Sequence, residues 1–178
     1  MRDFFIYKFV HIEYYQSNIH ICTTMYLYLV QHAEAVSKDI DPSRGLSEKG
    51  MDDIKRISQY ISGMNLEVHK IFHSGKKRAL QTAQVLATHL EIEDKVTEAD
   101  GLSPMDNPEV WFSKIHDFNK NVILVGHLPH MAKLASLALC GNQDNNAVNF
   151  EMGCIVCLRK DDEQHWSTDW IVKPGMVN

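Results

Sequence analysis

Two apolar runs, each followed within two residues by a histidine, constrain the fold of this chain more than any other feature. Residues 26–30 read YLYLV and residues 122–125 read VILV, and the histidines are His32 and His127. Short runs that are apolar almost throughout are typical of strands buried on both faces, as in parallel sheets covered by helices. We therefore predict two central strands, each with a histidine just beyond its carboxyl end.

Elsewhere the pattern alternates between helix and strand. Ser47 is a predicted N-cap, and apolar residues then recur at helical spacing until Gly63 and Asn65, which end the helix. Alternating strands and helices indicate a three-layer α/β/α sandwich with a mainly parallel central sheet. The other predicted elements are strands at 68–72, 154–158 and 166–172, and helices at 76–90, 108–118 and after Pro129.

Composition is that of one globular domain, which we place at residues 25–178. The net charge of -5 argues against a nucleic-acid partner, and no apolar run is long enough to span a membrane. Residues 1–24 lack the pattern of a signal peptide and form an N-terminal extension, non-native or disordered; Met25 is a candidate natural start. We expect a cytoplasmic protein. The sequence leaves the oligomeric state open, and a monomer is compatible with it.

The cysteines do not predict a disulfide or metal framework. Cys154 and Cys157 form a C-x-x-C, but both fall in a predicted strand, where side chains three apart point to opposite faces. We expect them to be reduced core thiols. His69 and His73 are also unsuited to share a metal, because strand geometry separates them by roughly 13 Å.

Basic residues gather where the carboxyl ends of the strands are expected. In open parallel sheets this edge carries the functional site, and if the two central strands are neighbours, His32 and His127 face each other there. Arg44 lies in a long loop, and residues 76–78 (KKR) open a helix whose N-terminus favours anions. Three cations at that position suggest an external anion to offset them. Arginine fits phosphate oxygens in a bidentate way, so a phosphate site is predicted.

Lys76 and Lys77 are better interpreted as a solvated basic face than as phosphate ligands. His130, three residues beyond His127, is a weaker candidate for a substrate contact in the same cleft.

Four ordered blocks of the chain resemble the histidine phosphatase superfamily (branch 1), which has an Arg-His-Gly signature and includes the phosphoglycerate mutases. The resemblance runs from Met25 to about Val172, and the small size and short loops are most similar to the bacterial phosphohistidine phosphatases of the SixA type. The blocks are Gln31-His32-Ala33-Glu34-Ala35, Arg44-Gly45-Leu46-Ser47-Glu48-Lys49-Gly50, Ser74-x-x-x-Arg78-Ala79-x-Gln81-Thr82-Ala83 and Gly126-His127-x-Pro129.

The resemblance implies a phosphoglycerate-mutase-like fold and a metal-independent phosphatase without cofactor. His32 would be the nucleophile that becomes phosphorylated, with His127 and Arg78 as further catalytic residues. Gln31, Arg44, Arg78 and His127 would bind the phosphoryl oxygens.

The chain departs from the family pattern at several positions. Gln31 replaces the signature arginine and Ala33 replaces the glycine, which removes one charge-assisted contact and some space near the backbone. Gly45 and Gly75 stand where SixA-type relatives usually carry proline, and we expect them to loosen two loops.

No general acid can be assigned with the same support. Asp106 and Glu109 are the nearest acidic residues, and both are more simply explained as a solvated helix start. SixA-type relatives also lack a clear acid. This suits a phosphohistidine substrate, because imidazole is a better leaving group than an alkoxide.

The expected partner is therefore a protein carrying phosphohistidine, or a small phosphorylated molecule. Two alternatives remain open: a phosphomonoesterase of a metabolite, and a phosphate-binding pseudoenzyme in which Gln31 marks lost catalysis.

Overall fold

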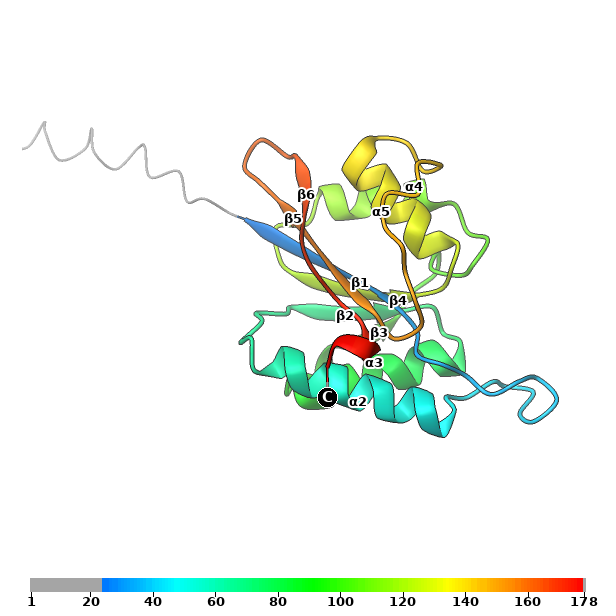
Figure 1. Ribbon diagram of the computed structural model, residues 1–178. Coiled ribbons are helices and arrows are strands. Elements are labelled where there is room, and N and C mark those ends of the chain that lie inside the picture. Colours follow the sequence, from blue (N-terminus) through cyan, green and yellow to red (C-terminus); the bar gives the residue numbers. More distant parts are fainter. Residues whose placement is uncertain (1–23, 178) are drawn as a thin grey trace, which may run out of the picture.

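The computed structural model describes residues 24–177, so the predicted extension, apart from Thr24, and Cys22 lie outside the described range (Figure 1). A six-stranded sheet with the order β3-β2-β4-β1-β5-β6 forms the centre. Its first four strands are parallel, β5 is antiparallel to β1, and β6 is antiparallel to β5. The strands are β1 (Met25–Gln31), β2 (Lys70–His73), β3 (Val96–Glu98), β4 (Val122–Gly126), β5 (Ile155–Lys160) and β6 (Trp166–Val172).

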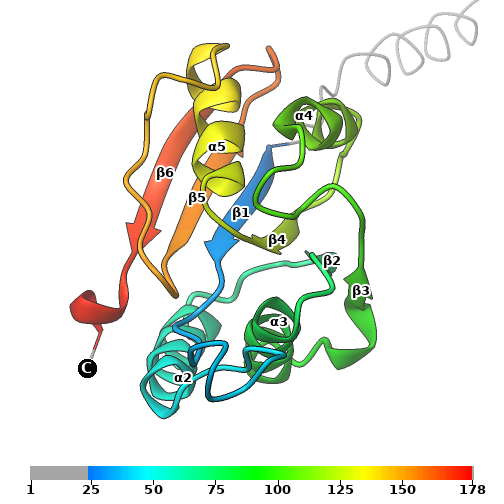
Figure 2. The ribbon, with the colours of Figure 1, turned by 90° about the vertical axis from the view of Figure 1, so that its right-hand side faces the viewer.

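Helices cover both faces of this sheet, as Figures 1 and 2 show, and the predicted three-layer α/β/α sandwich is confirmed. Tyr28 and Val30 of β1 belong to the core on the α2 and α3 side, whereas Leu27 and Leu29 belong to the core on the opposite side. The helices are α2 (Glu48–Ser62), α3 (Lys77–His89), α4 (Pro108–His116) and α5 (His130–Cys140), with short 3-10 helices η1 (Glu93–Lys95) and η2 (Pro174–Met176).

Local sequence explains where the helices start. The hydroxyl of Ser47 accepts a hydrogen bond from the Gly50 N–H, which makes Ser47 the N-cap of α2 as predicted. Asn107 caps α4 in the same way, with Pro108 at the first helical position. Among the described helices, none is long and apolar enough to cross a membrane.

One strand was missed in the sequence, and the expectation for Cys154 and Cys157 is confirmed. The three-residue strand β3 was not predicted, because Val96–Glu98 offers a single large apolar residue and no readable alternation. Cys140 is exposed. Cys154 and Cys157 are buried in different core clusters, which confirms that their side chains point to opposite faces of the sheet.

The pairing of β1 with β4 places the two predicted histidines together. The strands run parallel with Gln31 opposite Gly126, so the chain leaves both at the same edge of the sheet. Figure 2 views the molecule from the side on which the loop after β1 extends. The loops at this edge hold the candidate site.

Candidate active site

His32 lies just past the end of β1 and is buried, with 8% of its surface exposed. Its Nδ1 is 2.7 Å from the carbonyl oxygen of Ala33. Because a carbonyl oxygen can only accept, Nδ1 carries the proton and Nε2 keeps its lone pair. Burial and the guanidinium charges of Arg78 and Arg44 together lower the pKa of His32 to about 4, against the opposing effect of the Ala33 hydrogen bond. His32 is therefore a neutral imidazole at pH 7.

Arg78, in the first turn of α3, points at that lone pair. Its Nε donates to His32 Nε2 over 3.0 Å. Burial and the charge of Arg44 lower the pKa of Arg78, yet a guanidinium keeps its charge at any physiological pH. The site thus pairs an available nitrogen lone pair with a fixed cation.

Thr82 links the backbone beside His32 to the backbone of Arg78. Its hydroxyl accepts from the Ala33 N–H (3.1 Å) and donates to the Arg78 carbonyl oxygen (2.8 Å). Thr82 and Ala33 have no exposed surface. One buried hydroxyl therefore fixes the backbone beside His32 relative to the start of α3, and Ala33 fits where the family signature has glycine.

The loop that carries Arg44 is anchored to the same helix. Arg44 has a left-handed backbone (φ 54°), and its Nε donates to the Val36 carbonyl oxygen at 3.4 Å. Gln81 accepts from the Leu46 N–H, and Lys77 forms an ion pair with Asp41 over 2.9 Å. Asp41 thus offsets part of the positive charge at the start of α3 from within the protein. The sequence predicts that an external anion would do this, and that expectation is corrected.

Gly45 is part of this anchoring, because its N–H donates to the Asp41 carboxylate over 3.0 Å. Proline could not supply that donor. Gly75 has φ 76°, which proline cannot adopt either, and a side chain there would overlap with Glu98. Both departures from the family pattern therefore fit local backbone requirements.

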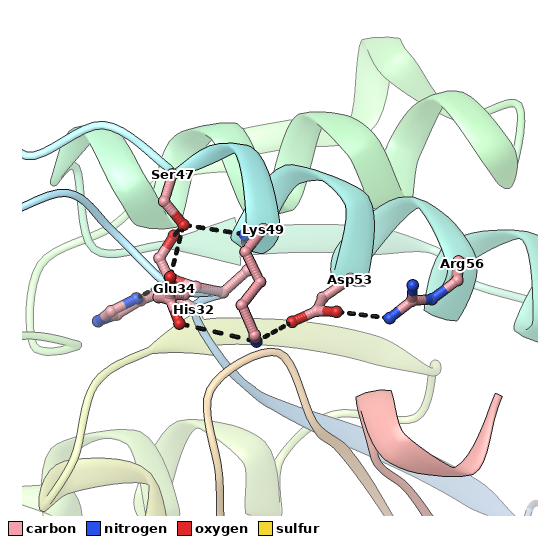
Figure 3. A network of polar contacts seen from close by, with 8 residues as sticks. His32, Glu34, Ser47, Lys49, Asp53 and Arg56 are labelled. Carbon is pink, nitrogen blue, oxygen red and sulfur yellow. Dashed lines mark hydrogen bonds and ion pairs between the residues drawn. The ribbon is translucent and has the colours of Figure 1, made fainter. Parts of the chain in front are cut away.

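A polar network holds the residue two positions after His32 against α2 (Figure 3). The Glu34 carboxylate accepts from the Ser47 hydroxyl (2.8 Å), and Lys49 contacts both Glu34 (3.6 Å) and Asp53 (2.6 Å). Gly50 packs so closely that a Cβ there would overlap with the Glu34 carbonyl group. The network fixes the start of the long loop.

His127 follows β4 and faces His32, with ring centroids 4.8 Å apart and the planes tilted by 59°. Its Nε2 is 2.6 Å from the Ser74 hydroxyl, and its Nδ1 has no hydrogen-bond partner. Burial, followed by electrostatic interaction with His32 and with the Arg78 guanidinium, lowers the pKa of His127 to about 3. Ser74 stands in the same motif as Arg78, and nothing in the sequence indicated that it contacts His127.

On the α5 side of the site, two further polar side chains are buried. Gln31 is 8% exposed, and its Oε1 has no hydrogen-bond partner. His130 is fully buried with both ring nitrogens unpaired, so the expectation that it faces the cleft is wrong. It lies in the first turn of α5, whose inner face joins the core.

The two acidic residues considered as general acids each make local contacts at the start of α4. Asp106 accepts from the Ser103 N–H over 2.7 Å, and exposed Glu109 lies next to the α4 cap Asn107. Among residues 24–177, no three His, Cys, Asp or Glu side chains form a group that could hold a metal.

The structure thus brings together His32, His127, Arg78 and Gln31 at one edge, and Arg44 acts on them from the adjoining loop. Neutral imidazoles among guanidinium groups can bind an anion and offer one nitrogen as a nucleophile.

Comparison with known proteins shows what this arrangement is similar to. Residues 27–110 match the family model described as histidine phosphatase superfamily (branch 1). The rat (Rattus norvegicus) 6-phosphofructo-2-kinase/fructose-2,6-bisphosphatase 4 is 35% identical over 92 residues, which are 50% of this chain. The match covers 19% of that relative's length.

Solved structures agree in fold. The protein histidine phosphatase SixA complexed with tungstate has a TM-score of 0.77 at 19% identity, covering 85% of this chain and 99% of that chain. A phosphoglycerate mutase from Plasmodium falciparum has a TM-score of 0.64 at 16% identity, covering 83% and 89%. The phosphoglycerate-mutase-like fold is confirmed.

Proposed function

We propose that the chain is a member of the histidine phosphatase superfamily and a metal-independent phosphatase that acts through a phosphohistidine on His32. One observation carries this proposal: the Nε2 lone pair of a buried, neutral His32 faces a cationic guanidinium 3.0 Å away. A nucleophile and the charge that would hold its target are thereby in place before a substrate binds.

In the first step, the phosphoryl oxygens take over the N–H groups of Arg78 and free the His32 lone pair. Nε2 then attacks phosphorus in line, a P–Nε2 bond forms, and the bond to the leaving group breaks. The leaving group keeps the electron pair and takes a proton from solvent. The Ala33 carbonyl stabilises the proton on Nδ1, which gains positive charge as Nε2 becomes bonded.

In the second step, water attacks the phosphorus of phosphorylated His32 and releases inorganic phosphate. Arg78, Arg44 and His127 stabilise the charge on the equatorial oxygens in both steps, while Gln31 takes the place of the signature arginine. These donors carry out the electrostatic task that metal ions perform in other phosphoryl transfers.

For the substrate, we propose protein phosphohistidine. Asp106 and Glu109 are engaged in a turn and a helix start, so an acid that protonates an alkoxide is not evident among the described residues. Imidazole leaves without such help. Similarity in fold to SixA, a protein histidine phosphatase, agrees with this choice.

The test is phosphate release from a phosphohistidine-bearing phosphotransfer domain in the presence of EDTA. We expect turnover by the wild type and none by His32→Ala, while His69→Ala, at an exposed histidine before β2, retains it. Mass spectrometry of a rapidly quenched reaction should find the phosphoryl group on His32. Turnover by His32→Ala, or inhibition by EDTA, would exclude this route.

Gln31 supports a second candidate, a phosphate-binding protein with lost catalysis. Its neutral amide replaces a charged group, and its Oε1 is buried without a partner. Restoring the charge with Gln31→Arg separates the candidates. A large gain from almost no turnover would favour the decayed site, whereas a change of a few-fold would show that glutamine is tolerated. A small phosphorylated metabolite is the other substrate class, favoured by the sequence match to a bisphosphatase.

A further inference from the structure

Exposed apolar side chains are concentrated on the loops at the edge of the sheet where the phosphate site lies. Eight large hydrophobic residues are exposed in the described chain, and five of them lie on the loops at the carboxyl edge of the parallel strands or in the first turn of α4. The two most exposed of them are Ile40, at 76%, and Met105, at 87%. We call these five the apolar rim: Ile40, Met105, Val110, Leu128 and Met152.

Three members of the rim adjoin residues that hold the site together. Leu128 directly follows His127. Met152 precedes Gly153, whose N–H donates to the carbonyl oxygens of Gln31 and His32. Ile40 precedes Asp41, which pairs with Lys77 at the start of α3.

The other two lie beside a hollow of about 420 Å³ that begins at Ser74, the partner of His127. Val110 lines this hollow, and Met105 stands between the lining residues Ser103 and Asp106. The rim therefore approaches the phosphate site from separate loops, after β1, β3 and β4 and before β5.

A second hollow, of about 410 Å³, opens next to the site on the α5 side. It is lined by Leu128, Pro129, Ala132, Val148 and Phe150, with Asn146 and Asn149. An apolar side chain of a partner would fit this lining.

Exposed apolar groups concentrated on one face are typical of surfaces that contact another protein. A small phosphorylated metabolite, held by Arg44, Arg78 and the two histidines, would leave the rim in water. A protein surface would cover it, and the charge of its phosphoryl group would match the cationic centre.

We propose that the apolar rim is the docking surface for the folded protein that carries the phosphohistidine, and that this protein is apolar around its phosphorylated side chain. This inference rests on the proposed function and names the partner of that site. The rim contributes to recognition of the protein, whereas the chemistry depends on the central residues alone.

The experiment compares two substrates, a phosphohistidine-bearing phosphotransfer domain and the free amino acid phosphohistidine. The variants are Met105→Glu and Met152→Glu in the rim, with Met64→Glu after α2 as the control, because Met64 is exposed to a similar degree as Met152 (39% and 44%). We expect the rim variants to lower kcat/KM for the domain about 10- to 100-fold, mainly through KM, and to leave the free amino acid unaffected. Met64→Glu should leave both reactions unchanged.

The outcomes are separable. Equal activity of rim and control variants on the domain, or an equal loss on both substrates, would overturn the docking surface and leave the proposed function intact. If the wild type released phosphate from neither substrate, the proposed function would fail and the docking surface with it.

Discussion

The two sides of the phosphate site differ in how completely their polar groups are paired. On the α3 side, His32, Arg78 and Thr82 hydrogen-bond with one another or with the backbone between them. On the α5 side, Gln31, His127 and His130 carry four of the six buried side-chain nitrogen and oxygen atoms that have no partner among the described residues.

The α3 side is therefore preorganised, whereas the unpaired groups on the α5 side lower the stability of the folded protein. Each buried polar atom without a partner destabilises the folded state by about 1–3 kcal/mol, whereas a paired one is near neutral or better. The α3 side is therefore built to hold the nucleophile and its cation in fixed positions. On the α5 side, polar groups are retained against their cost, so we expect a change at His130, which the proposed mechanism does not use, to raise stability and to affect catalysis little.

The largest effect is expected from Arg78→Met, on the paired side. Methionine keeps much of the length but removes the charge and the donors, so kcat should fall about 10²–10³-fold, or about 3–4 kcal/mol. The measurement is single-turnover phosphate release. Arg159→Met, at an exposed arginine on β5, is the control and should retain full activity. If both variants had equal activity, Arg78 would not stabilise the transition state.

Next in size is Gly50→Ala, which acts on the α2 anchor of the same side. The added methyl group would overlap with the Glu34 carbonyl group, so Glu34 or the start of α2 must move. We expect the free energy of unfolding to fall by about 3 kcal/mol, measured by urea denaturation. Gly63→Ala at the end of α2 meets its nearest atom at 3.4 Å and should change stability little. Similar values for the two variants would refute this role of Gly50.

Thr82→Val is expected to have a smaller effect. Valine keeps the shape of threonine but loses both hydrogen bonds that join Ala33 to Arg78. As a positioning residue, Thr82 should affect kcat about 10-fold and leave KM unchanged, which corresponds to about 1.4 kcal/mol. Thr88→Val, at an exposed position of α3, provides the control. A rise in KM at constant kcat would instead assign Thr82 to substrate binding.

Residues that stand in motifs were predicted on both sides of the site, whereas the contacts that pair polar groups over long distances in the sequence were not. His32 and Arg78 stand in motifs, and the apolar runs that precede the two histidines identify β1 and β4 directly. Contacts between polar groups far apart in the sequence leave no recognisable pattern in it. The ion pair between Lys77 and Asp41 joins residues 36 positions apart, and the Ser74–His127 contact joins residues 53 apart.

Burial on a helix start was also hard to predict. His130 follows a motif and resembles a cleft residue in the sequence, but the first turn of α5 directs it into the core, where it has no exposed surface. The burial of His130 could not be predicted from its residue type, because burial depends on which face of the helix the residue occupies. Strand β3 was missed because it is short and is held mainly by its pairing with β2.

His130→Leu tests the unpaired side and should have the smallest effect at neutral pH. Burial lowers the pKa of His130 to about 4, against the opposing influence of Asp106. Between pH 6.5 and 4 the unfolded chain therefore binds a proton that the folded protein does not, and this histidine lowers stability as pH falls through that window. Leucine removes both this proton uptake and two unpaired nitrogens. We expect the free energy of unfolding to rise by about 1 kcal/mol at pH 8 and by more at pH 5, with activity nearly unchanged. Urea denaturation at the two pH values measures this difference. A loss of stability at both would mean that His130 has a partner that keeps it in place, and the contrast between the two sides would not hold.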